Sequence, residues 1–404
     1  MDDYQLRARN DHIRWDNQDW DRKQAQKAYQ REAAAAGAAI RRGDTAWGAA
    51  HLGMHDLAIE IARDRAAASS VALDESRARQ GLRKAKAAFE AGDHFAALQA
   101  LDGVIALQPR NWRALEMRGH CHLRRDAFDA AEEDFDKARL HGAPAADARF
   151  FAGVAQMRAR RYTAALLSFT RAIEAGDRSA SVHFRRGICR LECGQPDDAA
   201  VDLEQAVRSE PDNAGYLAVL GEALVRAERP ERAVAALDRA EALGRTVASL
   251  YLWRAEAKLS LDEAEAALAD VEAAIARDPA VSGAYALRGD IHMALEKFNT
   301  AIRDFDIYVQ KRPDRLIGYL RKGDALAMTG RTGEAIEQYH LAARRAPQSP
   351  RPHFREAKAL LEAGMAKGAQ RAIERCLALA PDDAPAARLS QEIAAALVGY
   401  RGLF

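Results

Sequence analysis

The amino-acid sequence predicts an all-α protein, a solenoid of stacked antiparallel helix pairs, and three observations support this fold class. Apolar residues make up 49% of the 404 residues, but many are alanine, which favours helices, and only 7% of the residues are aromatic. No segment alternates β-branched and polar residues as a half-buried strand does. A period of 34 residues also runs through about three quarters of the chain without an insertion.

The second helix of each repeated unit is marked by alanine. Starting at Ala199 and stepping by 34 residues in both directions, we find the same residue nine times. These residues are Ala97, Ala131, Ala165, Ala199, Ala233, Ala267, Ala301, Ala335 and Ala369. Nine identical residues at one fixed spacing do not follow from composition alone, so each step is predicted to contain one structural unit.

The first helix of each unit is marked by a small residue twelve positions before that alanine. These residues are Ala85, Gly119, Gly153, Gly187, Gly221, Ala255, Gly289, Gly323 and Ala357. A large apolar residue follows the alanine by four positions: Leu101, Phe135, Phe169, Leu203, Leu237, Val271, Phe305, Tyr339 and Ile373. Residues four apart share a helix face, so we expect the small residue to face the alanine and the large residue to fill the gap between neighbouring units.

Glycine and proline mark the helix ends. The first helix is expected to end at glycine in four units, at Gly92, Gly194, Gly330 and Gly364. A proline stands twelve positions after the alanine in six units: Pro109, Pro211, Pro279, Pro313, Pro347 and Pro381. Ala143, Asp177 and Arg245 replace it in the others. Proline cannot continue a helix interior, so it marks the boundary between units, which must stack to bury their apolar faces.

The repeated unit resembles the tetratricopeptide repeat. The stretch "FRRGICRLECGQPDDAAVDLEQAVRSEP", residues 184–211, contains most of that signature in Gly187, Ala199, Leu203, Ala206 and Pro211. The resemblance covers nine units within residues 78–383. It implies a right-handed superhelix whose first helices line a concave face that binds protein segments.

Both ends of the chain depart from the repeat. Residues 1–77 are expected to form an N-terminal helical segment, in which 33–67 makes a degenerate repeat or cap that is broken near Gly43 and Asp44. Residues 384–404 are expected to form a C-terminal capping helix and tail over the last repeat.

Composition excludes several classes of function. The net charge is +1, so no strong attraction to nucleic acid or anionic lipid is expected. No run of about eighteen apolar residues spans a membrane, and the charged N-terminus contains no secretory signal. Four cysteines suit a reducing compartment, so we expect a cytoplasmic protein, and the alanine- and arginine-rich composition indicates a bacterial source.

No catalytic or metal-binding group is predicted. Cys189 and Cys193 share a helix face, but a zinc site needs about four ligands and no second pair follows at that spacing. His51 and His55 have a metal-site spacing without the glutamate of the zinc-protease motif, and the histidines of "HCH", residues 120–122, face different sides of a helix. The repeats and caps occupy the chain, so we expect no enzyme, no cofactor and no metal.

An arginine precedes the glycine of the first helix in three units, at Arg118, Arg186 and Arg288. We expect these arginines to be structural or interfacial, and to pair with acids of the second helix such as Asp134 or Asp304.

Two sets of residues are candidates for partner binding. With the small residue of the first helix counted as position 8, the resemblance implies that positions 2, 5, 9, 12 and 13 face the concave side. Position 9 is acidic in four consecutive units: Glu222, Glu256, Asp290 and Asp324. We call these residues the acidic stripe and expect it to attract lysine or arginine of a partner. Alternatively, the acids are solvated or paired internally, since Arg226 lies four residues after Glu222 and Arg321 three before Asp324.

The second candidate set is apolar and lies at positions 5, 9 and 12 of two earlier units. It comprises Phe150, Val154, Met157, Phe184, Ile188 and Leu191, which we call the apolar trough. An exposed apolar strip commonly marks a binding site. The alternative is that these side chains pack within the array.

The sequence therefore favours a non-enzymatic scaffold or adaptor that binds an extended or helical segment of a partner with basic and apolar residues. Two alternatives stay open. One is a sensor that changes shape on binding a short peptide or small ligand, and the other is a structural subunit that self-assembles.

Overall fold

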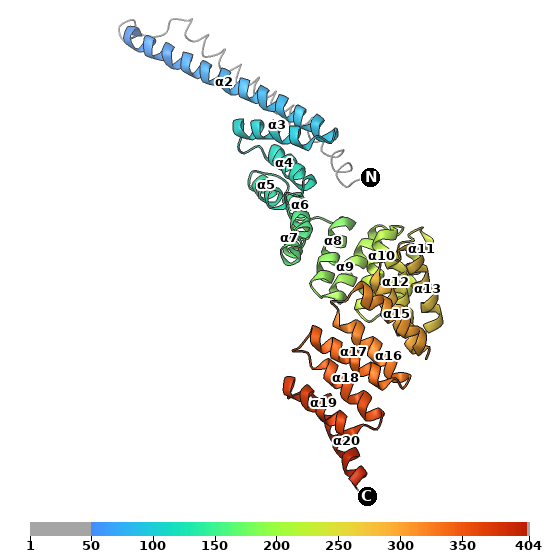
Figure 1. Cartoon of the computed structure of the whole chain (residues 1–404). Coiled ribbons are helices and arrows are strands. Elements are labelled where there is room, and N and C mark those ends of the chain that lie inside the picture. Colours follow the sequence, from blue (N-terminus) through green and yellow to red (C-terminus); the bar gives the residue numbers. More distant parts are fainter. Residues whose placement is uncertain (1–49, 402–404) are drawn as a thin grey trace. The chain divides into compact units, whose positions relative to one another are not determined.

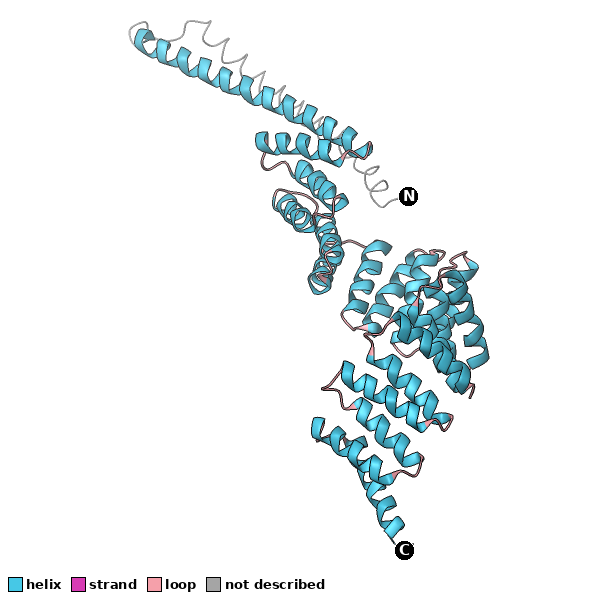
Figure 2. Cartoon of the chain, in the orientation of Figure 1, coloured by secondary structure: helices cyan, strands magenta, loops and turns pink. Residues whose placement is uncertain are grey.

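The structure is a computed structural model that describes residues 50–401, with side chains for residues 63, 64 and 66–397. Every regular element in this range is an α-helix (Figure 2). Three features of the sequence lie outside the described part: the expected hairpin break near Gly43 and Asp44, the side chains of His51 and His55, and residues 402–404 of the tail. The chain divides into two units after Gly81, and the second unit, Leu82–Phe404, contains the repeats.

The second unit is a run of paired helices (Figure 1). The first helices of the repeats are the C-terminal part of α2 (Ala50–Glu90), α4 (Trp112–Arg124), α6 (Ala145–Arg158), α8 (Ala180–Glu192), α10 (Ala214–Arg226), α12 (Ala248–Ser260), α14 (Ser282–Ala294), α16 (Leu316–Met328) and α18 (Arg351–Glu362). The second helices are α3 (His94–Leu107), α5 (Phe128–Leu140), α7 (Tyr162–Glu174), α9 (Pro196–Ser209), α11 (Pro230–Ala242), α13 (Ala264–Arg277), α15 (Phe298–Lys311), α17 (Thr332–Arg345) and α19 (Ala366–Leu379). The last helix is α20 (Ala384–Arg401).

Each helix from α4 to α19 packs against the helix before and the helix after it, as expected for an all-α solenoid. From α6 onward, the first helices of neighbouring repeats also contact each other directly, from α6 with α8 to α16 with α18. These direct contacts bring corresponding positions of successive first helices onto one surface, which we call the first-helix face.

In the six repeats with a glycine on the first helix, the large residue of the second helix lies against that glycine. A β-carbon added at Gly187 would lie 2.8 Å from Leu203 Cγ and 3.3 Å from the carbonyl oxygen of Ala199. The expected partner of the glycine was the alanine alone, and the closer contact is with the large side chain. Large residues also fill the space between repeats as expected, because Val271 shares a core cluster with Ala284 and Ile291 of the next repeat.

The first helix of all nine repeats ends at a residue with positive φ. Glycine occupies this position in the four units where it was expected, but five others place a residue with a side chain there: Asp126, Arg160, Glu228, Asp262 and Glu296. The hydrogen bonds explain the conformation. The N–H of Glu228 donates to Val225 O at 3.0 Å and that of Arg229 to Leu224 O at 2.9 Å, which satisfies carbonyls at the helix end.

The three units without a boundary proline use another connection. Gly142, Gly176 and Gly244 each have φ near 90–100° one residue before the position where proline stands elsewhere. A left-handed glycine therefore ends the second helix where proline is missing.

The C-terminal helix packs on the last repeat. Leu389 and Ile393 of α20 are buried in one cluster with Ala357 of α18 and Ile373 of α19. The apolar side chains of the last pair are thereby removed from water.

Candidate interaction surface

The four residues of the acidic stripe lie on consecutive first helices, α10, α12, α14 and α16, which contact one another in that order. Their charges interact. Asp324 and Glu256 both raise the pKa of Asp290, and Arg226 acts on Glu256 as well as on Glu222. The structure therefore brings the four predicted acids onto one electrostatically connected surface.

Glu222 is neutralised within its own helix, as its spacing from Arg226 predicts. Arg226 Nη2 lies 2.6 Å from Glu222 Oε1. The same guanidinium lies over the ring of Trp253 in the next first helix, 5.4 Å from the ring centre. Arg226 is thus held by a carboxylate and an aromatic face at once.

Asp290 and Asp324 are paired with arginines from the following repeat. Arg321 Nη1 lies 2.9 Å from Asp290 Oδ2, and Arg355 Nη1 donates to Asp324 Oδ2 at 2.7 Å. The Tyr339 hydroxyl also donates to Asp324 Oδ1 at 3.0 Å. The expectation that Arg321 neutralises Asp324 of its own helix is therefore wrong, because Arg321 reaches back to the preceding repeat.

Glu256 differs from the other three acids. It is exposed, and it forms no ion pair with any residue that the structure describes. The two positions that supply arginine to its neighbours are occupied by Leu287, 31 residues later, and by Ser260, four residues later. The residues at these two positions carry no charge, so the carboxylate of Glu256 has no arginine at the positions that supply one to the other acids.

The surrounding helices reduce the hydration of all four carboxylates. Desolvation is the main reason that the pKa values of Glu222, Glu256 and Asp324 are raised, and it raises the pKa of Asp290 to about 6. Nearby arginines act in the opposite direction. A carboxylate in this setting gains more from a positively charged partner than one in bulk water does.

The internal pairs reduce the charge of the surface. Four carboxylates face three guanidinium groups, those of Arg226, Arg321 and Arg355, which leaves a net charge of −1 in place of the −4 that the acids alone would give. The uncompensated charge is at Glu256. The acidic stripe is therefore a mixed surface with one available acid.

Two residues of the apolar trough are core residues. Phe150 is 1% exposed and packs with Phe169, and Leu191 is 5% exposed and packs with Leu203. The prediction that they line an open surface is wrong, because their side chains point between the helices of the stack.

The other four residues of the trough, Val154, Met157, Phe184 and Ile188, are half-buried. The ring of Phe184 lies against that of Tyr216 in the next first helix, with 4.5 Å between ring centres. Tyr216 was not among the predicted residues, although an aromatic side chain at the start of the neighbouring first helix was a usable signal. The apolar surface is thus smaller than predicted and includes an aromatic pair whose rings are tilted by 30°.

The arginines before the glycine of the first helix are structural, which is one of the two roles expected for them. Arg186 donates to both oxygens of the buried Asp202 at 2.8 and 2.6 Å. Arg118 with Asp134 and Arg288 with Asp304 form the same paired arrangement.

A fourth pair, Arg254 with Asp270, was missed. Arg254 also reaches Asp238 of the preceding repeat at 2.7 Å, so it connects two repeats. Such fully bonded buried pairs favour one helix register and are not available to a ligand.

Cys189 and His120, two of the candidate metal ligands that the structure describes, are packed into the array, and Cys193 is half-buried. Cys189 is buried, and desolvation raises the pKa of its thiol to about 12. His120 is buried against Phe135 and Phe151, and burial lowers its pKa to about 3. Within the described residues, no three His, Cys, Asp or Glu side chains form a group that would hold a metal ion. No helix in residues 50–401 is long and apolar enough to cross a membrane.

Several solved structures are similar to this chain. They include MamA from Desulfovibrio magneticus RS-1, with 22% identity over 42% of this chain and 96% of that one and a TM-score of 0.39. The C-terminal part of a TPR repeat-containing protein from Cytophaga hutchinsonii has 14% identity over 69% and 99% of the two chains and a TM-score of 0.42. The APC/C hetero-tetramer Cut9–Hcn1 has 12% identity over 80% and 88%, with a TM-score of 0.47. No curated protein sequence matches the chain.

The family model described as tetratricopeptide repeat matches residues 82–145, 128–180, 184–248 and 286–350. These ranges together cover more than half of the chain. The repeats that they match are the helix pairs described above, and repeats of this kind in general form protein-interaction scaffolds. The chain belongs to the tetratricopeptide repeat family.

Proposed function

We propose that this chain is a non-enzymatic scaffold that binds an extended or helical segment of a partner protein along its first-helix face. In this proposal Glu256 receives a lysine or arginine side chain of the partner. The binding uses no cofactor and no catalytic step. Four free cysteines suit a reducing compartment such as the cytoplasm.

The single observation that supports the proposal is the unequal pairing of the acidic stripe. Glu222, Asp290 and Asp324 each have an arginine within 3 Å, whereas Glu256 is exposed and has no such arginine among the described residues. The three paired acids indicate which group Glu256 would bind, because each of them forms an ion pair with one guanidinium group. A partner that supplied this group at Glu256 would complete the series.

Apolar contacts would add to this ion pair. Ile188 and Phe184 on α8 and Tyr216 on α10 are half-buried, and α8 and α10 are the two first helices that precede α12 with its Glu256. Burying such side chains contributes about 25 cal/mol for each Å² removed from water, part of which is offset by the cost of ordering the partner. The proposed partner segment therefore contains a cationic residue that contacts Glu256 on α12 and an apolar residue that contacts α8 or α10.

The test is quantitative affinity capture from lysate with three baits: the wild type, Glu256→Gln and Glu265→Gln. Glu265 is an exposed acid on the second helix α13, so its variant loses the same charge on a different surface. We expect at least one partner to be retained by the wild type and Glu265→Gln and depleted by Glu256→Gln. When the lysine or arginine of that partner is replaced, the wild type and Glu256→Gln should capture equal amounts of it.

Equal capture by all three baits would contradict the role of Glu256. A bait whose mass in solution rises with concentration, with no partner captured, would favour the self-assembling subunit instead.

A further inference from the structure

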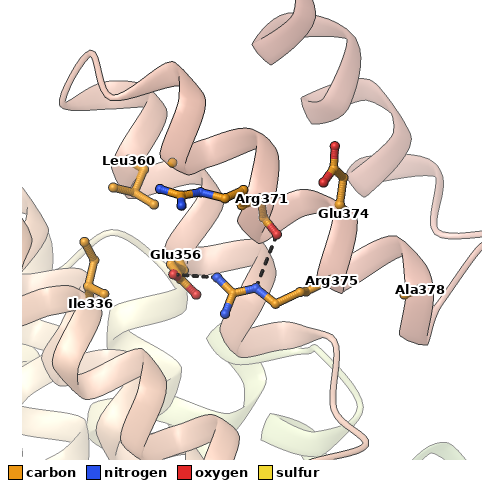
Figure 3. A pocket seen from close by; sticks show the side chains of 8 residues that line it. Ile336, Glu356, Leu360, Arg371, Glu374, Arg375 and Ala378 are labelled. Carbon is orange, nitrogen blue, oxygen red and sulfur yellow. Dashed lines mark hydrogen bonds and ion pairs between the residues drawn. The ribbon is translucent and has the colours of Figure 1, made fainter.

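A pocket of about 690 Å³ lies between α17, α18 and α19 (Figure 3), and no residue of the acidic stripe lines it. Most of the residues that line it come from the second helices α17 and α19. They are Ile336, Glu356, Leu360, Gly368, Arg371, Glu374, Arg375 and Ala378. The pocket therefore belongs to a different surface from the first-helix face.

A buried carboxylate orients one of the two arginines in this pocket. Glu356 has 5% of its side chain exposed, and its Oε1 accepts hydrogen bonds from Arg375 Nη2 at 2.9 Å and from His340 Nε2 at 3.2 Å. Arg375 Nε donates to the carbonyl oxygen of Arg371 at 3.2 Å. These bonds use two of the three guanidinium nitrogens of Arg375, so Nη1 keeps its donors.

The second arginine is not held in this way. Arg371 is exposed, lies one helical turn before Arg375 on α19, and forms no ion pair or side-chain hydrogen bond with any described residue. Figure 3 shows the guanidinium groups of Arg371 and Arg375 extending to the same side of α19, toward the helices with Leu360 and Ile336. The spacing of four residues places both groups on one helix face.

The remaining polar groups around the pocket do not neutralise these arginines. Burial and the charge of Arg375 lower the pKa of His353, and a histidine offsets no positive charge in either protonation state. Glu374 is exposed and accepts a hydrogen bond from Gln370 Nε2 at 2.9 Å, and in Figure 3 it points away from the two guanidinium groups. Donors of Arg371 and Arg375 therefore face an open hollow.

We propose that this pocket binds an acidic side chain of a partner protein, with an adjacent aliphatic residue of that partner against Ile336, Leu360 and Ala378. Guanidinium groups bind carboxylates through two parallel hydrogen bonds, which suits two arginines on one helix face. Glu356 pairs with Arg375, and Glu374 points away from both guanidinium groups, so the guanidinium of Arg371 is the positive charge that no described residue offsets. A singly charged carboxylate matches this charge, whereas a doubly charged phosphate would bring excess negative charge near Glu356.

The test uses two short peptide amides that differ in one group, acetyl-Leu-Glu-amide and acetyl-Leu-Gln-amide, together with inorganic phosphate. Each is titrated into the full chain by ligand-observed NMR. We expect the glutamate peptide to bind with a dissociation constant of about 1 mM, as is usual for so small a ligand, and the glutamine peptide to bind about tenfold more weakly.

Two variants locate the binding. Arg371→Gln should weaken the glutamate peptide about tenfold, whereas Arg344→Gln, which removes an exposed arginine of α17 outside the pocket lining, should leave it unchanged. Ala378→Glu adds a carboxylate at the exposed edge of the lining without disturbing the core, and should weaken the same peptide by repulsion. Circular dichroism confirms that each variant is folded.

The outcomes separate this site from the first-helix face. Glu256→Gln should bind the glutamate peptide as the wild type does. A negative result for the pocket therefore does not bear on the proposed role of Glu256, and the reverse also holds. Equal binding of the two peptides, tighter binding of phosphate, or an unchanged affinity in both Arg371→Gln and Ala378→Glu would overturn the proposal.

Discussion

The contact between Gly187 and Leu203 allows a direct test of how the two helices of a repeat fit together. A methyl group at residue 187 would lie 2.8 Å from Leu203 Cγ, which is about 0.7–1.2 Å closer than an ordinary carbon contact. Leu203 is fully buried, so it has no free space to move into. Gly187→Ala must therefore separate α8 from α9 or force Leu203 out of its rotamer.

The expected cost follows from two opposing effects. Overpacking of a core costs about 1–3 kcal/mol, and replacing glycine by alanine inside a helix returns about 1 kcal/mol. Gly187→Ala should thus lower the free energy of unfolding by about 1 kcal/mol. Gly103 on α3 is exposed with open space around it, so Gly103→Ala should instead raise that free energy by about 1 kcal/mol.

A compensating change makes the prediction sharper. Another repeat combines Ala255 with Val271 at the positions of Gly187 and Leu203, so one methyl group is gained on the first helix and one methylene lost on the second. Leu203→Val alone should cost about 0.5–1.5 kcal/mol. The double variant should be more stable than the sum of the single variants predicts, by about 1 kcal/mol or more.

Urea unfolding followed by circular dichroism measures these differences. Repeat arrays need not unfold in one step, so amide hydrogen exchange in α8 and α9 gives a local value for the same contact. A Gly187→Ala variant as stable as Gly103→Ala, or a double variant whose loss equals the sum of the single losses, would refute the reasoning.

Three further predictions concern the turns, the buried ion pairs and a buried histidine. Glu228→Gly removes a side chain from a residue with φ of 55° and should stabilise the chain by about 0.5 kcal/mol in urea unfolding, whereas Gly194→Ala, at φ of 73°, should destabilise it. Asp270→Asn leaves the buried guanidinium of Arg254 without its main partner and should cost about 3 kcal/mol in the same assay. His120 is neutral when folded and protonates below about pH 6.5 when unfolded, so the unfolded state binds more protons and stability falls as the pH is lowered from 6.5 toward 3. His120→Leu should reduce this slope by about 1.4 kcal/mol per pH unit in unfolding experiments across that range.

The fold was accessible from the sequence because the period fixes which residues share a face. Ala199 and its eight equivalents located every second helix, and Gly187 and its equivalents located every first helix. The turns were only partly predictable. Glu228 adopts a conformation that its residue type disfavours, because the helix pairs on both sides determine the backbone there.

The candidate site was less accessible because its charges are balanced between repeats. Arg321 is three residues from Asp324 in sequence but pairs with Asp290, 31 residues away, since the first helices of successive repeats lie against each other. Local spacing contains no information on that choice. Phe150 illustrates the same limit, because the position in the repeat did not decide which side of the helix faces the core.

The central claim is that Glu256 is the acid that accepts a cation from the partner, and one measurement tests it most directly. The dissociation constant of the captured partner segment is compared between the wild type, Glu256→Gln and Glu265→Gln. An ion pair at a partly desolvated carboxylate contributes about 1–2 kcal/mol, so we predict a loss of about 5- to 30-fold for Glu256→Gln and none for Glu265→Gln. Equal affinities for all three proteins would contradict the claim.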